Sequence, residues 1–310
     1  MIDYPAARAI AMIVQTGSFE AAARALGVTP SAISQRVRNF EERLGTVLVE
    51  RGSPCRPTET GAMLCLHMEQ VGVLENTLMQ RMPGLGEGGA FRTSLSIATN
   101  ADSLATWLTE ALTEFGADGD CLLNISVDDE EHTADALRNG RVIGAISALD
   151  RPVQGCAIKP LGSLRYAATA SPAFVQKYLA EGVTPRSLAR APALCFDRKD
   201  QLQQSWVRNT FGQQLAFPTH WLPSTHAFVE ACLGGLGWAL NPQSMVSAHL
   251  ASGRLVELVP GAVFDRPLYW QINRIVMPQL AALTRAITRA ARKGLVPAAQ
   301  GDAAEPHDGM

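Results

Sequence analysis

The sequence predicts a mixed α/β protein in two parts, a small helical unit at the N-terminus and a larger α/β region, joined by a helix. Three observations predict this fold class. The first 60 residues form short segments separated by Gly27, Gly45 and Gly61. Residues 58–82 carry apolar side chains at helical spacing. From about residue 92, β-rich runs alternate with helical segments, which is typical of βαβ units.

The composition is that of an ordinary globular chain. With 310 residues, 47% hydrophobic and 18% charged, the chain is long enough for two domains with sizeable cores. The formal net charge of −2 means that any nucleic-acid binding must come from a local patch. No apolar run is long enough to cross a membrane, and the N-terminus lacks the basic stretch of a signal peptide. We therefore expect a cytoplasmic protein with no membrane partner.

The cysteines argue against a metal or redox site. All six lie far apart with no C-x-x-C pair, and the histidines have no metal-ligand spacing. We expect mostly buried thiols in a reducing compartment, and no metal or cofactor.

Residues 18–44 have the features of a helix-turn-helix. Ala22–Ala23 supply small side chains where two helices would touch, and Gly27 suits a turn that needs positive φ. Thr29 is a good N-cap for the second helix and Pro30 suits its first position. These features occur in one register, which favours the motif over two unrelated helices.

The second helix is predicted to have an apolar face and a polar face. The inward positions at helical spacing are Ile33, Val37, Phe40 and Leu44. Serine, glutamine and arginine can reach base edges and phosphates in a major groove, and the opposite face carries Ser31, Ser34, Gln35, Arg36 and Arg38. The alternative is an ordinary solvated helix face.

A short hairpin is predicted after this helix. The strand Val47–Glu50 precedes a turn at Gly52–Pro54, and a basic tip there would track the backbone or the minor groove. The candidate DNA-contacting residues are therefore Thr29, Ser31, Ser34, Gln35, Arg36, Arg38, Arg51, Arg56 and Pro57.

The helix at 58–82 begins at the N-cap Thr58 and has a heptad-like seam of Leu64, Met68, Val71, Leu74 and Leu78. Its position between two domains favours a dimerising helix over one that packs only on its own domain. Residues 83–89, PGLGEGG, are predicted to be a hinge.

The α/β region is expected to form two small lobes with mainly parallel strands, rather than one continuous sheet. The predicted strands are 94–99, 121–127, 142–147, 166–171, 192–196, 219–223, 237–242, 255–260 and 268–274. The predicted domains are a DNA-binding unit 1–60, a linker 58–90, lobe 1 at 91–162 plus 266–293, lobe 2 at 163–265, and a disordered tail at 294–310.

The N-terminal motifs resemble those of LysR-type transcriptional regulators. The matching residues are Ser18–Phe19, Ala22–Ala23, Leu26, Ser31–Gln35, Phe40–Glu41, Arg51, Arg56–Thr58 and Gly61. The resemblance implies a winged helix-turn-helix, a linker helix and a two-lobed effector domain like periplasmic binding proteins. It also implies double-stranded promoter DNA, a second copy of the chain in a dimer or tetramer, and RNA polymerase as partners.

Within that family the chain resembles the ArgP and LysG branch, which regulates the export of basic amino acids. The most specific match is NADSLATWL at 100–108, and others are SQRV at 34–37, VDDE at 127–130 and LYW at 268–270. This resemblance implies lysine or arginine as the effector and an exporter promoter as the target.

A ligand site is predicted where the run 99–104 leaves a strand and opens a helix. A helix N-terminus with hydroxyl and amide groups suits a carboxylate, and nearby carboxylates suit a ligand ammonium or guanidinium. The alternative roles are helix caps and solvated turns. The candidate effector-binding residues are Thr99, Asn100, Asp102, Ser103, Asp128, Glu130 and Asp197.

Three other functions are weaker. The sequence contains no G-x-S-x-G, H-E-x-x-H or P-loop, so an enzyme is not expected. A LysR-type regulator with a different effector and target stays open. A solute-binding protein would need export, which the N-terminus does not support, and cell fractionation separates it from a cytoplasmic regulator.

Overall fold

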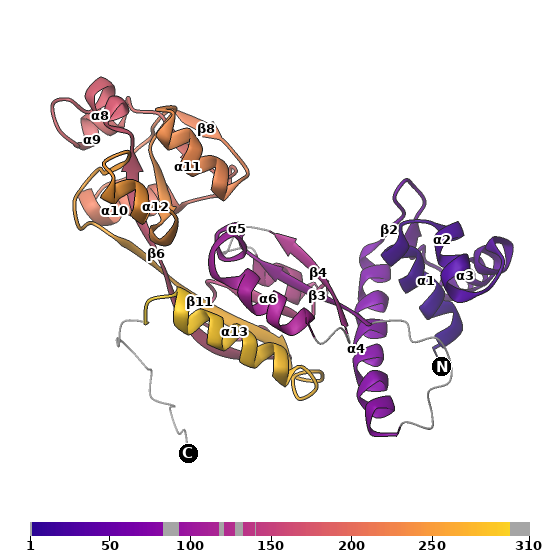
Figure 1. Ribbon diagram of the computed structural model, residues 1–310. Helices are drawn as coiled ribbons and strands as arrows, with labels where there is room; N and C mark the ends of the chain where they lie inside the picture. The colour runs from indigo at the N-terminus through magenta and orange to yellow at the C-terminus, as the bar shows by residue number, and fades with distance from the viewer. Residues whose placement is uncertain (1, 83–92, 118–120, 128–132, 140, 298–310) are drawn as a thin grey trace, which may run out of the picture.

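The computed structural model describes residues 2–82, 93–117, 121–127, 133–139 and 141–297 (Figure 1). Its helices include α1 (Tyr4–Thr16), α2 (Phe19–Leu26), α3 (Pro30–Leu44), α4 (Glu59–Arg81), α5 (Ala101–Ser103), the π-helical turn η2 (Leu104–Leu108), α6 (Thr109–Gly116), α7 (Thr133–Arg138), α8 (Pro172–Tyr178), α9 (Pro185–Leu188), α10 (Leu202–Phe211), α11 (Thr225–Leu233), α12 (Gln243–Ala251) and α13 (Ala281–Gly294).

The strands are short at the N-terminus and longer in the α/β region. They are β1 (Val49–Glu50), β2 (Arg56–Pro57), β3 (Thr93–Thr99), β4 (Cys121–Val127), β5 (Gly144–Ser147), β6 (Cys156–Ala170), β7 (Ala193–Cys195), β8 (Thr219–Trp221), β9 (Ala239–Pro242), β10 (Val256–Glu257) and β11 (Phe264–Asn273).

The N-terminal unit forms as predicted around its own apolar core. The side chain of Ser18 caps α2, and that of Thr29 caps α3 by accepting from the Ala32 amide. Gly27 ends α2 at φ 66°, a left-handed conformation that favours glycine. The helices bury Ala22, Ala23, Ile10, Ile13, Ile33, Val37 and Phe40.

One inward position was predicted wrongly. Leu44 lies at the C-terminal end of α3 and its side chain is 49% exposed. Gly45 ends the helix at the next residue, so no further turn extends the apolar face over a neighbouring helix.

The wing is a two-stranded antiparallel hairpin of β1 and β2, in which Val49 pairs with Pro57 and Glu50 with Arg56. Its base is clamped to α4. Gly61 packs so closely on the wing that an added Cβ would lie 1.9 Å from the Leu48 carbonyl oxygen. This contact explains why a helix otherwise suited to larger residues carries glycine there.

Helix α4 starts at the predicted cap Thr58 and runs between the N-terminal unit and lobe 1 (Figure 1). The predicted seam is divided between environments. Leu64 packs against the N-terminal core, whereas Leu74 and Leu78 are exposed. The hinge predicted at 83–89 lies outside the described residues.

The α/β region has two lobes, as predicted, but its strands are not mainly parallel and its main sheet continues from one lobe into the other. The main sheet has the order β10-β6-β11-β5-β3-β4, with β9 also paired to β6. Only β3–β4 and β3–β5 are parallel in it, because β6 and β11 run antiparallel to their neighbours. These two long strands pass through both lobes and make the sheet continuous, which strand propensity alone cannot reveal.

The crossing between the lobes is marked by a break in the ladder of β6 and β11. Leu268 pairs with Gly162, and the register shifts before Tyr269 pairs with Pro160. On the lobe 1 side, α6 and α13 lie together on the sheet (Figure 1).

Disorder was predicted from residue 294, which is too early, because residues 294–296 still belong to the fold. Gly294 ends α13, Leu295 is buried, and Val296 exchanges backbone hydrogen bonds with Ser163. This pairing ties the segment after α13 to the crossing strand β6. Residues 298–310 lie outside the described residues.

Candidate DNA-binding face and effector cleft

The polar face of α3 is open to solvent, as a groove-reading helix requires. Ser31, Gln35 and Arg38 are exposed, and Ser34 and Arg36 are half-buried beside the Ile33–Val37 core face. Thr29 is also exposed, and its hydroxyl lies 3.0 Å from that of Ser31. The helix therefore brings the candidate residues from 29 to 38 onto one accessible surface.

Two of these side chains have partners on α3 itself. The Gln35 amide donates to Asn39 Oδ1 at 2.6 Å, and the Arg38 guanidinium binds Glu42 at 2.8 Å. The Glu42 carboxylate raises the pKa of Arg38 through this hydrogen bond. Arg36 is less exposed than Arg38, but it has no ion pair among the described residues, so it need not leave a partner to bind a phosphate or a base.

The wing is held to α3 by a residue that the sequence analysis did not single out for a role. Glu41 Oε1 accepts from the backbone amides of Leu48 at 2.7 Å and Val49 at 3.2 Å. A carboxylate that accepts two amides fixes the start of β1 relative to the recognition helix. The signal for this role in the sequence was that Glu41 belongs to the Phe40–Glu41 pair of the family motif.

The three wing candidates lie beside this anchor, but in different settings. Arg56 is exposed on β2 and pairs across the hairpin with Glu50, and Pro57 follows it half-buried. Arg51 stacks over the Phe19 ring, with 5.0 Å from guanidinium carbon to ring centroid. This contact orients Arg51 toward the start of α2.

At the carboxyl ends of β3 and β5, buried polar side chains gather that have no hydrogen-bond partner in the described part of the chain. Both amide atoms of Asn100 and the hydroxyl of Ser103 are buried, and none has a hydrogen-bond partner among the described residues. The hydroxyl of Ser147, which ends β5, is also buried without a hydrogen-bond partner among the described residues. Thr99, which ends β3, is fully buried. Buried unpaired polar atoms are costly, so they indicate a place for a ligand or ordered water.

The register of the sheet explains why these residues meet. Ala98 on β3 pairs with Ala145 on the parallel strand β5, so Asn100 and Ser147 end up at the same edge. Ligands in such sheets bind outside the carboxyl ends of the strands. Ser147 was missed by the sequence analysis, although its strand was predicted.

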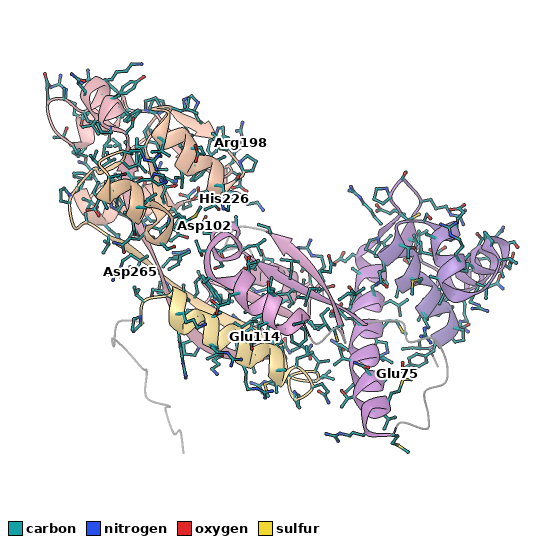
Figure 2. All side chains as sticks on the ribbon, viewed as in Figure 1. Glu75, Asp102, Glu114, Arg198, His226 and Asp265 are labelled. Carbon is teal, nitrogen blue, oxygen red and sulfur yellow. The ribbon has the colours of Figure 1, made fainter. Side chains whose placement is uncertain are left out.

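Asp102 joins the two lobes at this edge. Its Oδ1 accepts from the Thr225 hydroxyl at 2.5 Å, and its Oδ2 from the Tyr166 hydroxyl at 2.7 Å. Asp102 belongs to α5 of lobe 1 (Figure 2). Thr225 opens α11 of lobe 2, and Tyr166 lies on β6. We use the name effector cleft for this group, with Thr99, Asn100, Ser103 and Ser147, because the sequence analysis predicts effector binding at this place.

The remaining candidates are not brought to the effector cleft by any described contact. Asp197 Oδ1 accepts from the amides of Lys199 and Asp200, which makes Asp197 a turn residue of its own loop. Asp128 and Glu130 lie outside the described residues. His226 follows Thr225 on α11 and is exposed (Figure 2).

A separate cavity of about 620 Å³ lies within lobe 2, lined by α10, β8 and the segment between them. Its lining includes Arg198, Arg208 and Trp221, with Asp200 as the acidic member. The Asp200 carboxylate is engaged by the amides of Phe196 and Leu202. The electrostatics of this cavity therefore disfavour a cationic ligand, in contrast to the effector cleft.

The cysteines are structural thiols. All six are thiols rather than members of disulfides, and burial raises the pKa of Cys65, Cys195 and Cys232 to about 12, so these three thiols stay protonated at neutral pH. In the described part of the chain, no group of three or more histidine, cysteine, aspartate or glutamate residues is arranged to hold a metal. Nor is any helix of that part long and apolar enough to span a membrane.

Comparison with known families matches both parts of the chain. Residues 6–62 match the bacterial regulatory helix-turn-helix protein of the lysR family, and residues 88–292 match the LysR substrate binding domain. The HTH-type transcriptional regulator LysG of Mycobacterium tuberculosis H37Rv is 41% identical over 294 residues, 95% of each chain. The regulator ArgP of Pseudomonas aeruginosa PAO1 is 42% identical over 296 residues, 96% of this chain and 98% of the relative.

Solved structures agree over the same length. A crystal structure of ArgP from Mycobacterium tuberculosis is 39% identical with a TM-score of 0.77, and covers 96% of this chain and 100% of that one. Full-length LysG from Corynebacterium glutamicum with the bound effector Arg is 34% identical with a TM-score of 0.67, and has the same coverage. These relatives are named as regulators rather than enzymes, which confirms the class expected from the sequence.

Proposed function

Because the chain belongs to the LysR family of transcriptional regulators, we propose that it is a sensor of a basic amino acid. In this proposal, lysine or arginine enters the effector cleft and changes how paired N-terminal units engage a promoter for a basic amino-acid exporter. The observation that carries it is the Asp102 carboxylate, held between the lobes beside buried, unpaired Asn100, Ser103 and Ser147.

The chemistry of the effector cleft supports an amino acid with a cationic group. The Asn100 amide nitrogen and the hydroxyls of Ser103 and Ser147 can donate to an α-carboxylate, whereas the Asn100 amide oxygen can accept from an ammonium group. Asp102 can bind an ammonium or guanidinium through charge-assisted hydrogen bonds. Because Asp102 also binds Tyr166 and Thr225, a ligand there alters the contact between the lobes.

For DNA binding, we propose that α3 enters the major groove, with Thr29, Ser31, Ser34, Gln35, Arg36 and Arg38 facing bases and phosphates. Arg51, Arg56 and Pro57 of the wing add contacts to the backbone or the minor groove. Paired half-sites need at least a dimer, and the exposed Leu74 and Leu78 of α4 offer an apolar face for it. A tetramer, contact with RNA polymerase and action in the cytoplasm complete the proposal.

The test is thermal unfolding of the full chain with each of the twenty amino acids at millimolar concentration. A ligand that binds only the folded state raises the unfolding temperature. We expect a rise with arginine or lysine. Asp102→Asn keeps the shape and should lose most of that rise, whereas Asp150→Asn, an exposed residue of the same lobe, should keep it.

Two results would count against the sensor. A rise of equal size in Asp102→Asn would remove the carboxylate from the site. No rise with either basic amino acid in the unmodified chain, together with a rise for another class of amino acid, would replace the effector and leave the DNA-binding assignment intact.

A further inference from the structure

Helix α4 has three faces with different neighbours. Leu64 and Cys65 pack against the N-terminal core, and Leu66 and Val73 pack on the core of the α/β region. A third stretch, which includes Leu78, is exposed. The helix therefore contacts both the DNA-binding unit and lobe 1 within one chain.

Glu69 lies between the two residues that contact lobe 1, since positions 66, 69 and 73 share one side of a helix. Its Oε1 accepts from the backbone amide of Ser96 on β3 at 2.5 Å. Burial raises the pKa of Glu69 to about 7, against the hydrogen bonds from Ser96 that lower it. A half-buried carboxyl group thus lies at the junction between a linker helix and a strand.

The Ser96 amide can bind Glu69 because the ladder with the neighbouring strand β5 begins only after Ser96. The Ser96 carbonyl accepts from the Ile143 amide, but the β5 ladder starts only at Ile97–Gly144. The amide and carbonyl of one strand residue point to the same side. Glu69 therefore occupies the place where a carbonyl of the next strand would otherwise bind.

The same strand leads directly to the effector cleft. Three residues after Ser96, β3 ends at Thr99, which is followed by Asn100 with its unpaired buried amide. At the other end of α4, the wing clamp at Gly61 and the contact of His67 with the Tyr4 hydroxyl tie the helix to the N-terminal unit. A continuous series of contacts thus joins the effector cleft, β3, Glu69, α4 and the DNA-binding unit.

We propose that Glu69 is a positioning residue that couples the movement of β3 to α4, and so transmits the state of the effector cleft to the DNA-binding unit. The coupling to a ligand rests on the proposed function, whereas the Glu69–Ser96 contact does not. A well-packed apolar residue at position 69 would hold α4 against β3 without fixing how far one is shifted along the other. A hydrogen bond to the single amide of Ser96 fixes that position.

The test is hydrogen exchange measured by mass spectrometry on the full chain, with and without millimolar arginine. Four proteins are compared: the unmodified chain, Glu69→Ala, Glu69→Gln, and Glu75→Ala, an exposed residue of the same helix (Figure 2). Without arginine, Glu69→Ala should speed exchange of the Ser96 amide by about tenfold or more. Glu69→Gln keeps an acceptor oxygen and should restore most of the protection, and Glu75→Ala should change nothing.

With arginine, the unmodified chain and Glu75→Ala should gain protection at 99–103 and show a changed exchange rate in α4. In Glu69→Ala, arginine should still protect 99–103 but should no longer change the exchange rate in α4, and arginine affinity should be altered less than about threefold. An α4 response that persists in Glu69→Ala, or unchanged Ser96 exchange there, overturns the proposal. Absence of protection at 99–103 in the unmodified chain refutes the proposed effector instead, and the Ser96 exchange still decides whether the contact exists.

Discussion

The DNA-binding face and the effector cleft are built in opposite ways. Every candidate on α3 comes from one run of residues, 29–38, and one helix is enough to align them. The effector cleft takes Asn100 from the end of β3, Ser147 from β5, Tyr166 from β6 and Thr225 from α11. The comparison teaches that a contiguous site is determined by periodicity, whereas an assembled site exists only once strand order and register are fixed.

The contiguous site still depends on one distant contact, and breaking it should have the largest effect. Gly61→Ala places a Cβ 1.9 Å from the Leu48 carbonyl oxygen, so the wing or α4 must shift. We expect a loss of about 3 kcal/mol in the free energy of unfolding of the N-terminal unit.

The measurement for Gly61→Ala is chemical denaturation followed by circular dichroism. Gly116→Ala, at the end of α6, is the matched control, because an added Cβ there meets no atom within 4 Å among the described residues beyond its own helix and chain neighbours, and it should change stability by less than about 1 kcal/mol. Equal stability of the two variants would show that the contact between Gly61 and the Leu48 carbonyl can relax around an added methyl group at little cost.

The junction between the two regions should make stability depend on pH. The pKa of Glu69 rises from 4.5 to about 7 on folding, so the folded state binds a proton more tightly than the unfolded chain. Its contribution to stability is therefore greatest below pH 4.5 and is lost as pH rises through 7. The loss is at most about 3 kcal/mol.

Glu69→Gln removes this titration, so its stability should stay flatter than that of the unmodified chain between pH 5 and pH 8, as measured by denaturation across that range. It should be the more stable of the two at the upper end. If the free energy of unfolding changes with pH in the same way in the two proteins, Glu69 is ionised in the folded chain and its charge is stabilised there by neighbouring groups.

The DNA-binding face can be tested by single arginines. Arg36→Ala should weaken operator binding by about 2 kcal/mol, or roughly thirtyfold, if Arg36 reaches a base. Arg38→Ala should cost less, because Arg38 must first leave its ion pair with Glu42.

Operator affinity is measured by fluorescence anisotropy at fixed salt, on a DNA fragment selected with the full chain. Arg254→Ala, an exposed arginine of lobe 2, controls for the loss of one positive charge. Equal losses for Arg36→Ala and Arg254→Ala would remove Arg36 from the interface.

The smallest effect is expected in the assembled site. Tyr166→Phe removes the hydroxyl that orients Asp102 and should lower arginine affinity by about 1 kcal/mol, roughly fivefold. Calorimetric titration measures this change. Tyr178→Phe, in the same lobe but remote from Asp102, should leave the affinity unchanged; tighter binding in Tyr166→Phe would indicate that Tyr166 competes with the ligand.

The sequence by itself determined the parts whose physics is local. Caps, turn glycines and apolar spacing placed α2, α3 and α4, and the residue types on α3 predicted the face that we propose to bind DNA. It also marked Asn100, Asp102 and Ser103, because a strand end followed by a helix start is a local pattern.

Only the tertiary structure decided the rest. It made the sheet continuous through β6 and β11, assigned Ser147, Tyr166 and Thr225 to the effector cleft, and placed Glu69 against Ser96. Asp197, which looked equivalent to Asp102 in sequence, binds amides of its own loop. The physical reason is that contacts between residues far apart in the chain depend on strand order, register and burial, none of which leaves a periodic trace in the sequence.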